Sequence, residues 1–178
     1  MGLKIIEGMK LKKELLRKAD DLKLKVRDNC ASFEHETPQY GAEQAKQIKS
    51  WMDAHHDILQ EILNLGLRIQ RTNMQTQVTI TLGGKDITQS MAAWILRRGQ
   101  GKNMKGLSSD DFAMWSMLTD RGLKESKEQL STGQILEKKI KRFFDPAERD
   151  RMKELYMSEP QLIDAKLEVV NATTDLLE

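Results

Sequence analysis

The chain has 178 residues, enough for one domain with a sizeable core. Charged residues make up 31% of it, aromatic residues only 5%, and there are three prolines, which favours a helical protein over a β-sandwich. The first hundred residues carry 16 basic and 12 acidic side chains and the remainder 13 and 15, a polarity too weak to indicate a nucleic-acid binder by itself.

Cysteine usage and hydropathy bear on the compartment. A single cysteine, Cys30, excludes an internal disulfide framework and fits a reducing environment. No apolar run approaches the 18 residues of a membrane-spanning helix, and the first residues show neither a signal peptide nor a myristoylation motif. We therefore expect a cytoplasmic protein that does not interact with membranes.

Two long amphipathic segments open the chain. The spacing of apolar residues predicts helices over about 9–33 and 42–73, separated by a breaker at 34–41 that contains Pro38 and Gly41. Such a pair forms an antiparallel hairpin. The predicted seams step alternately by four and three residues, through Leu15, Ala19, Leu22, Val26, Asn29 and Phe33, and through Ile48, Met52, His55, Leu59, Ile62, Gly66 and Ile69.

The middle of the chain has a different pattern. Residues 78–82 alternate apolar and polar side chains before Gly83-Gly84, which predicts a strand entering a tight turn. Thr88 stands where the N-cap of a helix over 89–96 belongs, 99–106 reads as loop, and Ser108 fits the N-cap of a short helix. Residues 122–134 are polar and irregular.

The last part is again helical. Residues 135–144 fit either a helix or a strand, and Asp145-Pro146 is a strong start signal for a helix that ends near Asn171. A second such signal at 158–161 predicts a restart or a kink. We expect a mainly α fold in one compact domain, with a helical hairpin (1–76), a β-hairpin with short helices (77–134) and a C-terminal helical segment (135–178) that packs back on the hairpin.

One polar pattern occurs twice, each time at the end of a long amphipathic segment. Asn and Thr follow the second helix and again follow the last helix, with two residues between them. Their short side chains hydrogen-bond to nearby backbone, so we expect them to cap two helix ends that meet in a polar junction, with a ligand pocket as the alternative. The residues concerned are Thr72, Asn73, Thr76, Asn171, Thr173 and Thr174.

Candidate chemistry is sparse. Basic side chains gather in and beside a glycine-rich segment, where they suit contact with phosphate or an acidic surface: Arg97, Arg98, Lys102 and Lys105. Gly99-Gln100-Gly101-Lys102 lacks the spacing of a nucleotide-binding loop. His55 and His56 point to different sides of a helix, and no metal-binding motif surrounds Cys30, so we predict no metal and no cofactor.

Three groups of residues carry a resemblance to a known family. They are Met9-Lys10-Leu11 with Arg17-Lys18-Ala19-Asp20; Arg68-Ile69, Thr72-Asn73, Thr76, Gly84-Lys85, Ile87-Thr88 and Ala92; and Leu162-Ile163-Asp164-Ala165, Asn171 and Thr173-Thr174-Asp175-Leu176. Together they resemble the septicolysin-like family, small helical bacterial and phage proteins whose function is not established. The resemblance covers the chain from about residue 9 to its end, although Ala172 stands where members usually carry Trp and 99–134 matches poorly.

The favoured function is that of a non-catalytic structural or assembly protein. It would act through helix–helix contacts with copies of itself and with other protein subunits, in the host cytoplasm or in a phage virion. The alternative is a binder of nucleic acid or of a phosphate ligand through the basic loop. An enzyme that uses the Asn/Thr cluster is the third hypothesis, and no catalytic constellation supports it.

Overall fold

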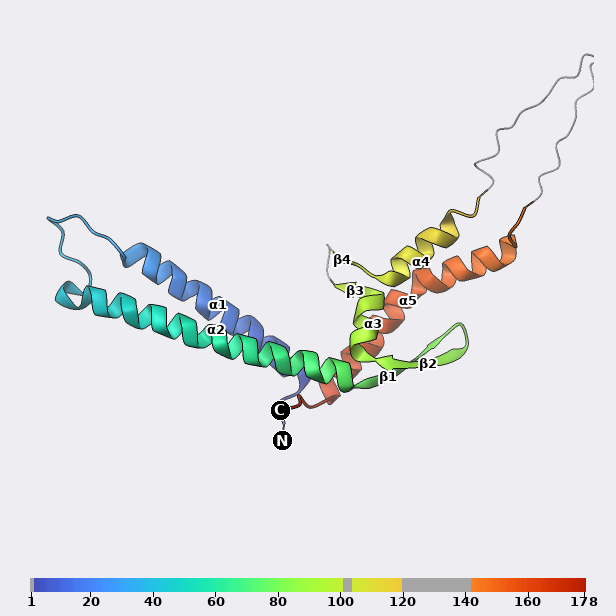
Figure 1. Cartoon of the computed structure of the whole chain (residues 1–178), viewed down its shortest axis with the longest axis horizontal. Coiled ribbons are helices and arrows are strands. Elements are labelled where there is room, and N and C mark those ends of the chain that lie inside the picture. The colour runs from blue at the N-terminus through green and yellow to red at the C-terminus, as the bar shows by residue number, and fades with distance from the viewer. Residues whose placement is uncertain (1, 101–103, 120–141) are drawn as a thin grey trace, which may run out of the picture. The chain divides into compact units, whose positions relative to one another are not determined.

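The computed structural model describes residues 2–100, 104–119 and 142–178, which form two compact units. Among the described residues, the first unit comprises 2–78, 90–92 and 167–178, and the second comprises 79–89, 93–100, 104–119 and 142–166. The fold class is confirmed: mainly helical, with a long antiparallel helical hairpin, a β-hairpin and a C-terminal helix that packs on other helices (Figure 1). The boundaries differ from the single domain with three consecutive segments that we expect, because the last twelve residues pack with the start of the chain.

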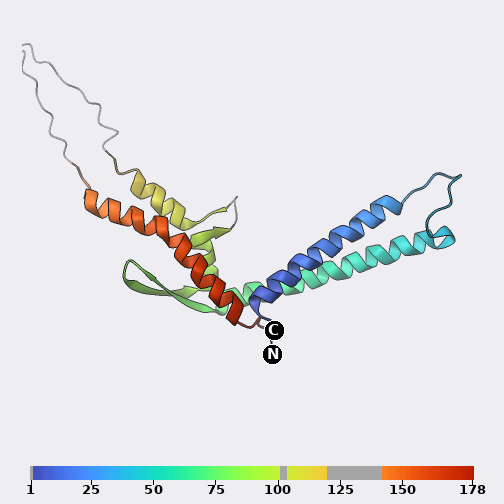
Figure 2. The same ribbon diagram turned by 180° about the vertical axis from the view of Figure 1, so that it is seen from behind.

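The helical hairpin of the first unit is formed by α1 (Ile5–Asn29) and α2 (Gln44–Gln75), which lie side by side in both views (Figures 1 and 2). The predicted first helix is shifted, since it begins and ends four residues earlier. At its start the Lys4 amide donates to the Glu7 carboxylate over 2.8 Å. At its end the Gln44 side-chain amide donates to the Asn29 carbonyl over 2.7 Å, which satisfies a carbonyl that the helix leaves unpaired. A 3₁₀ turn, η1 (Gly41–Glu43), leads into α2.

The C-terminal tail closes the first unit by pairing with the N-terminus. The Leu176 amide donates to the Leu3 carbonyl over 2.7 Å, and the Ile5 amide donates to the Thr174 carbonyl over 3.0 Å. An ion pair of 2.9 Å joins the Lys4 ammonium to the Asp175 carboxylate beside these bonds. The tail packs so closely that a Cβ at Gly8 would lie 2.5 Å from the Leu176 side chain.

The second unit contains most of a β-hairpin formed by β1 (Gln77–Leu82) and β2 (Lys85–Ser90). Val78, Ile80 and Leu82 alternate with exposed residues, as predicted. Gly83 and Gly84 both have positive φ, which a two-residue turn between twisted strands requires and which glycine adopts without strain. Thr88 lies within β2, so its predicted role as a helix cap is wrong; the strand extends to α3 (Met91–Arg98).

Two short strands and two helices complete the described part of the chain. Two short strands, β3 (Gly99–Gln100) and β4 (Met104–Lys105), pair antiparallel where we predict a loop. The helix α4 (Leu107–Ser116) begins after Gly106 rather than Ser108, whose hydroxyl instead donates to the Arg97 carbonyl over 3.0 Å. The helix α5 (Pro146–Thr173) starts where predicted, with the Ala147 amide donating to Asp145, and it continues through Pro160. The predictions for 122–134 and 135–141 concern residues outside the described ranges.

Candidate interaction surface

The contact between α1 and α2 uses only part of the apolar surface of α2. Leu15 and Ala19 of α1 are buried, and so are Trp51, Leu65 and Thr72, three members of one heptad row of α2. The predicted seam of α2 is therefore partly wrong, since Met52 and Leu59 are exposed. The sequence carries two adjacent rows, and the buried one begins one residue earlier, at Trp51.

The uncovered row forms a stripe along α2, in which the exposed polar residues His56 and Gln70 also lie. At 100° per residue its five apolar members fall within an arc of about 80°. All of them are large apolar side chains with substantial exposure: Met52 58%, Leu59 42%, Leu63 53%, Leu67 51% and Met74 68%. Isolated exposed leucines are ordinary, but a stripe of five along one helix indicates a contact surface.

The first helix adds to the same side of the hairpin. Met9, Leu16 and Leu24 of α1 are exposed and fall within an arc of about 80° that flanks the seam. At 100° per residue Arg27 points in the same direction as Met9. A hollow of about 540 Å³ has Arg27 of α1 and Met52 of α2 among its lining residues, so the two stripes lie on one side. We call these eight residues the exposed apolar face: Met9, Leu16, Leu24, Met52, Leu59, Leu63, Leu67 and Met74.

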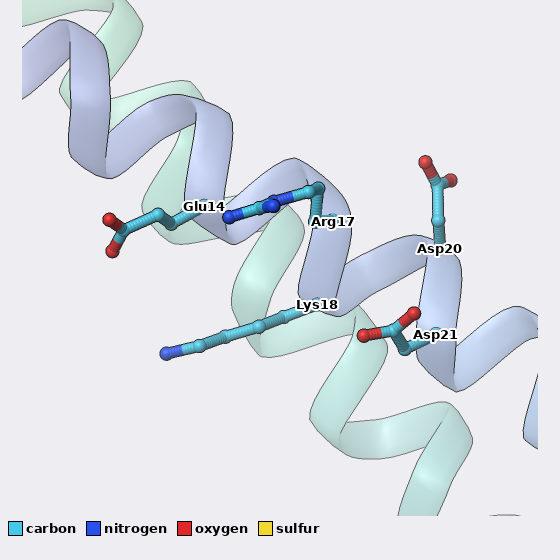
Figure 3. A pocket seen from close by; sticks show the side chains of 5 residues that line it. All are labelled: Glu14, Arg17, Lys18, Asp20 and Asp21. Carbon is cyan, nitrogen blue, oxygen red and sulfur yellow. The ribbon is translucent and has the colours of Figure 1, made fainter.

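The outer surface of α1 has the opposite character. Figure 3 shows Glu14, Arg17, Lys18, Asp20 and Asp21 projecting from one helix around a surface hollow of about 500 Å³. All five are exposed, and α1 alone supplies them. An ion pair of 2.6 Å between Lys23 and Asp20 continues this charged surface. The outer side of α1 is thus charged, and at 100° per residue the exposed Lys13 and Asp20 also fall within the arc of Met9, Leu16 and Leu24.

The threonines of the repeated Asn/Thr pattern make hydrogen bonds of different kinds. The Thr72 hydroxyl donates to the Arg68 carbonyl over 2.8 Å and accepts the Leu177 amide over 3.0 Å, while the Thr76 carbonyl accepts the Met91 amide. Thr173 donates to Val169 of its own helix, and the Thr174 carbonyl accepts the Ile5 amide. These backbone and hydroxyl bonds, rather than the asparagines, join the end of α2 and the C-terminal tail to their neighbours.

The two asparagines do not cap their helices, and that expectation is wrong. Asn73 lies inside α2, which ends at Gln75 with Thr76 as its cap, and Asn171 lies inside α5. Their Oδ1 atoms are buried and accept no hydrogen bond from the described residues. A buried amide oxygen without a partner costs free energy, so each asparagine is a point of weakness at the end of its helix.

Of the four predicted basic residues, Arg97 and Arg98 are paired with carboxylates. The Arg97 guanidinium donates to both oxygens of Glu159 over 2.5 and 2.8 Å and to Asp111 over 3.2 Å, and Glu159 is 1% exposed. The bond to Glu159 raises the pKa of Arg97 above its ordinary value. Arg98 donates to Asp164 over 2.7 Å. Lys105 is exposed, and Lys102 lies outside the described residues.

The local sequence does not indicate Glu159, the acidic partner of Arg97. Glu159 follows Ser158 and precedes Pro160, a pattern that indicates a helix start rather than a buried carboxylate. Tyr156, one turn earlier on α5, is half-buried, and burial raises the pKa of its hydroxyl. The sequence does carry one signal, because the spacing of three places Tyr156 and Glu159 on the same face of a helix.

Comparison with known proteins adds information on the fold. No family model matches the sequence, and a search of curated proteins found no match. The chain is similar to the crystal structure of a functionally unknown conserved protein from Corynebacterium diphtheriae, with a TM-score of 0.55 and 19% identity over 99% of this chain and 100% of that one. At this identity the likeness concerns the fold alone. The resemblance to the septicolysin-like family stays a prediction.

Two searches of the described residues complete the description. No group of three or more His, Cys, Asp or Glu side chains is placed there so that it could hold a metal ion. No helix within the same ranges is long and apolar enough to cross a lipid bilayer.

Proposed function

We propose that this chain is a non-catalytic assembly protein whose helical hairpin joins a second copy of itself through the exposed apolar face. The observation that carries the proposal is the width of the apolar surface of α2. Its covered and uncovered rows together span about 220° of the helix, about twice the arc that a helix needs to pack on one neighbour. A helix with such a surface is suited to two neighbours, and α1 supplies one.

The size of the face fits a dimer. The 25 residues of α1 make the shared length of the hairpin about 37 Å, and two helices side by side are about 20 Å wide. The face therefore measures about 700 Å², close to the roughly 800 Å² per partner of a standard interface. Two hairpins that pack through equivalent faces form a four-helix bundle related by a two-fold axis, the commonest symmetry of soluble oligomers.

Leu63 and Leu67 lie at the centre of the stripe, so their replacement tests the proposal. We expect light scattering to give about twice the 20.5 kDa chain mass for the natural sequence at micromolar concentration, and the single chain mass for the double variant Leu63→Glu/Leu67→Glu. The matched control is Leu162→Glu on α5, a leucine of comparable exposure at 45%, which should remain dimeric. A monomeric natural protein, or a double variant that associates like it, would contradict the proposal.

The alternative of phosphate binding through the basic loop has weaker support. Arg97 and Arg98 already hold carboxylates, so a phosphate would have to displace Glu159 or Asp164. Breaking the contact to Glu159 would leave a buried charge without its partner, which is costly. We therefore do not base a function on these arginines.

A further inference from the structure

The second unit holds a pocket that the proposed assembly function does not use. It has a volume of about 460 Å³ and lies between the β1–β2 hairpin, α3 and α5. This volume falls in the range of roughly 300–1,000 Å³ that is typical of small-molecule sites. On β2, Lys85, Ile87 and Gln89 line it because alternate residues of a strand share one face.

The lining of the pocket is largely apolar. Met152 and Leu155 of α5 stand on the same wall, Ile87 and Leu82 come from the β-hairpin, and the fully buried Trp94 comes from α3. Such a lining suits the hydrocarbon or aromatic body of a ligand, since the contact removes apolar surface from water.

The charges of the pocket are not balanced. Glu159 is the acidic member of the lining, and the Arg97 guanidinium neutralises it through two hydrogen bonds. Lys85 and Arg151 also line the pocket, and neither has a carboxylate partner among the described residues. The lining therefore carries an excess of two positive charges, both on exposed residues.

We propose that this pocket binds a small anion with an apolar body, namely a carboxylate on an alkyl or aryl group. Lys85 and Arg151 pair with the anionic group, and the apolar body lies against Ile87, Met152 and Leu155. A cationic ligand with the same apolar body should bind more weakly, because Lys85 and Arg151 repel it. A neutral ligand should also bind more weakly, because it displaces water from the two cations without pairing with them.

Calorimetric titration of the full chain with octanoate tests the proposal, with 1-octanol and octylammonium as probes of the same body. We expect one octanoate per chain and about tenfold weaker binding of the other two probes, because they lose two charged contacts and each such contact at an exposed cation contributes roughly threefold. Octanoate binding should also weaken as salt is added.

Two double variants locate the site. Lys85→Met/Arg151→Met should weaken octanoate binding about tenfold or more, whereas Lys105→Met/Lys166→Met, which removes two exposed cations outside the pocket, should change it less than about twofold. Leu63→Glu/Leu67→Glu should retain binding, which separates this pocket from the exposed apolar face. No octanoate binding, equal binding of octanol, or equal losses in the two cation variants would overturn the proposal.

Discussion

The backbone amide of Leu177 donates to the hydroxyl of Thr72, 3.0 Å away and 105 residues earlier in the chain. Thr72 is 1% exposed, and its hydroxyl also donates to the Arg68 carbonyl. One buried oxygen thus joins the last turns of α2 to the C-terminal tail, which in turn pairs with the residues just before α1.

This relationship predicts the effect of Thr72→Val, a change that preserves shape and removes the hydroxyl. The Leu177 amide loses its acceptor, so the free energy of unfolding should fall by about 1–2 kcal/mol in urea denaturation. Hydrogen exchange at Leu177 should accelerate. The control is Thr76→Val, because the tertiary bond of Thr76 comes from its carbonyl and survives the change. Equal losses in both variants would show that β-branched packing, not the hydroxyl, matters here.

Replacing Asn73 or Asn171, whose side-chain oxygens have no hydrogen-bond partner among the described residues, should increase stability rather than reduce it. Replacing either asparagine by leucine of similar shape removes a buried acceptor without a partner and should raise the free energy of unfolding by about 1 kcal/mol. Asn64→Leu, at an exposed position of α2, reports the gain from helix propensity alone, a few tenths of a kcal/mol. A loss of stability at Asn73 and Asn171 would restore the view that these side chains satisfy backbone groups.

Two glycines in the same hairpin should respond differently to alanine. A Cβ at Gly8 lies 2.5 Å from the Leu176 side chain, so Gly8→Ala forces the tail to shift and should cost about 1–3 kcal/mol. At Gly66 the nearest atom is the Lys12 ammonium at 3.4 Å, so Gly66→Ala should add about 0.5–1 kcal/mol through helix propensity. Thermal unfolding of both variants measures the contrast. Stabilisation by Gly8→Ala would mean that the tail is not packed on α1 in solution.

The ion pair of Arg97 and Glu159 predicts a loss of stability when its cation is removed. Arg97→Met leaves Glu159 buried without its cation, and we expect a cost of about 2–3 kcal/mol in the free energy of unfolding, below the ~3–5 kcal/mol of a fully buried pair because Arg97 is 26% exposed. Glu159→Gln in the Arg97→Met background supplies the comparison, because it removes the unpaired charge and should recover part of the lost stability in urea denaturation. A double variant no more stable than Arg97→Met would contradict this account.

Tyr156 predicts a loss of stability in alkali. Burial raises its pKa above the ordinary value of 10.0, so the folded state holds the proton to higher pH than the unfolded chain. Its contribution to stability is complete below that value and is lost as pH rises through the pKa of the folded state. Tyr156→Phe should therefore flatten the decline in urea midpoint as the pH rises above about 9. An equally steep decline in the variant would contradict this role of the Tyr156 hydroxyl.

Local signals in the sequence were sufficient to determine several elements. Alternation at Val78, Ile80 and Leu82 before Gly83-Gly84 predicts the β-hairpin correctly, because strand periodicity and positive φ are properties of neighbouring residues. Asp145 and Pro146 likewise predict the start of α5. The long helices and the mainly helical fold class follow from apolar periodicity in the same way.

Only the tertiary structure decided which surfaces and charges meet. The two rows of α2 are equally helical in sequence, and tertiary packing determines that the row with Trp51 and Leu65 is buried while the row with Leu59 and Leu63 is exposed. Arg97 reaches Glu159 across 62 residues, and Thr72 reaches Leu177 across 105. Backbone sterics and periodicity act over a few neighbouring residues. These pairings join residues that are far apart in the sequence and depend on how separate helices pack, so no local pattern predicts them.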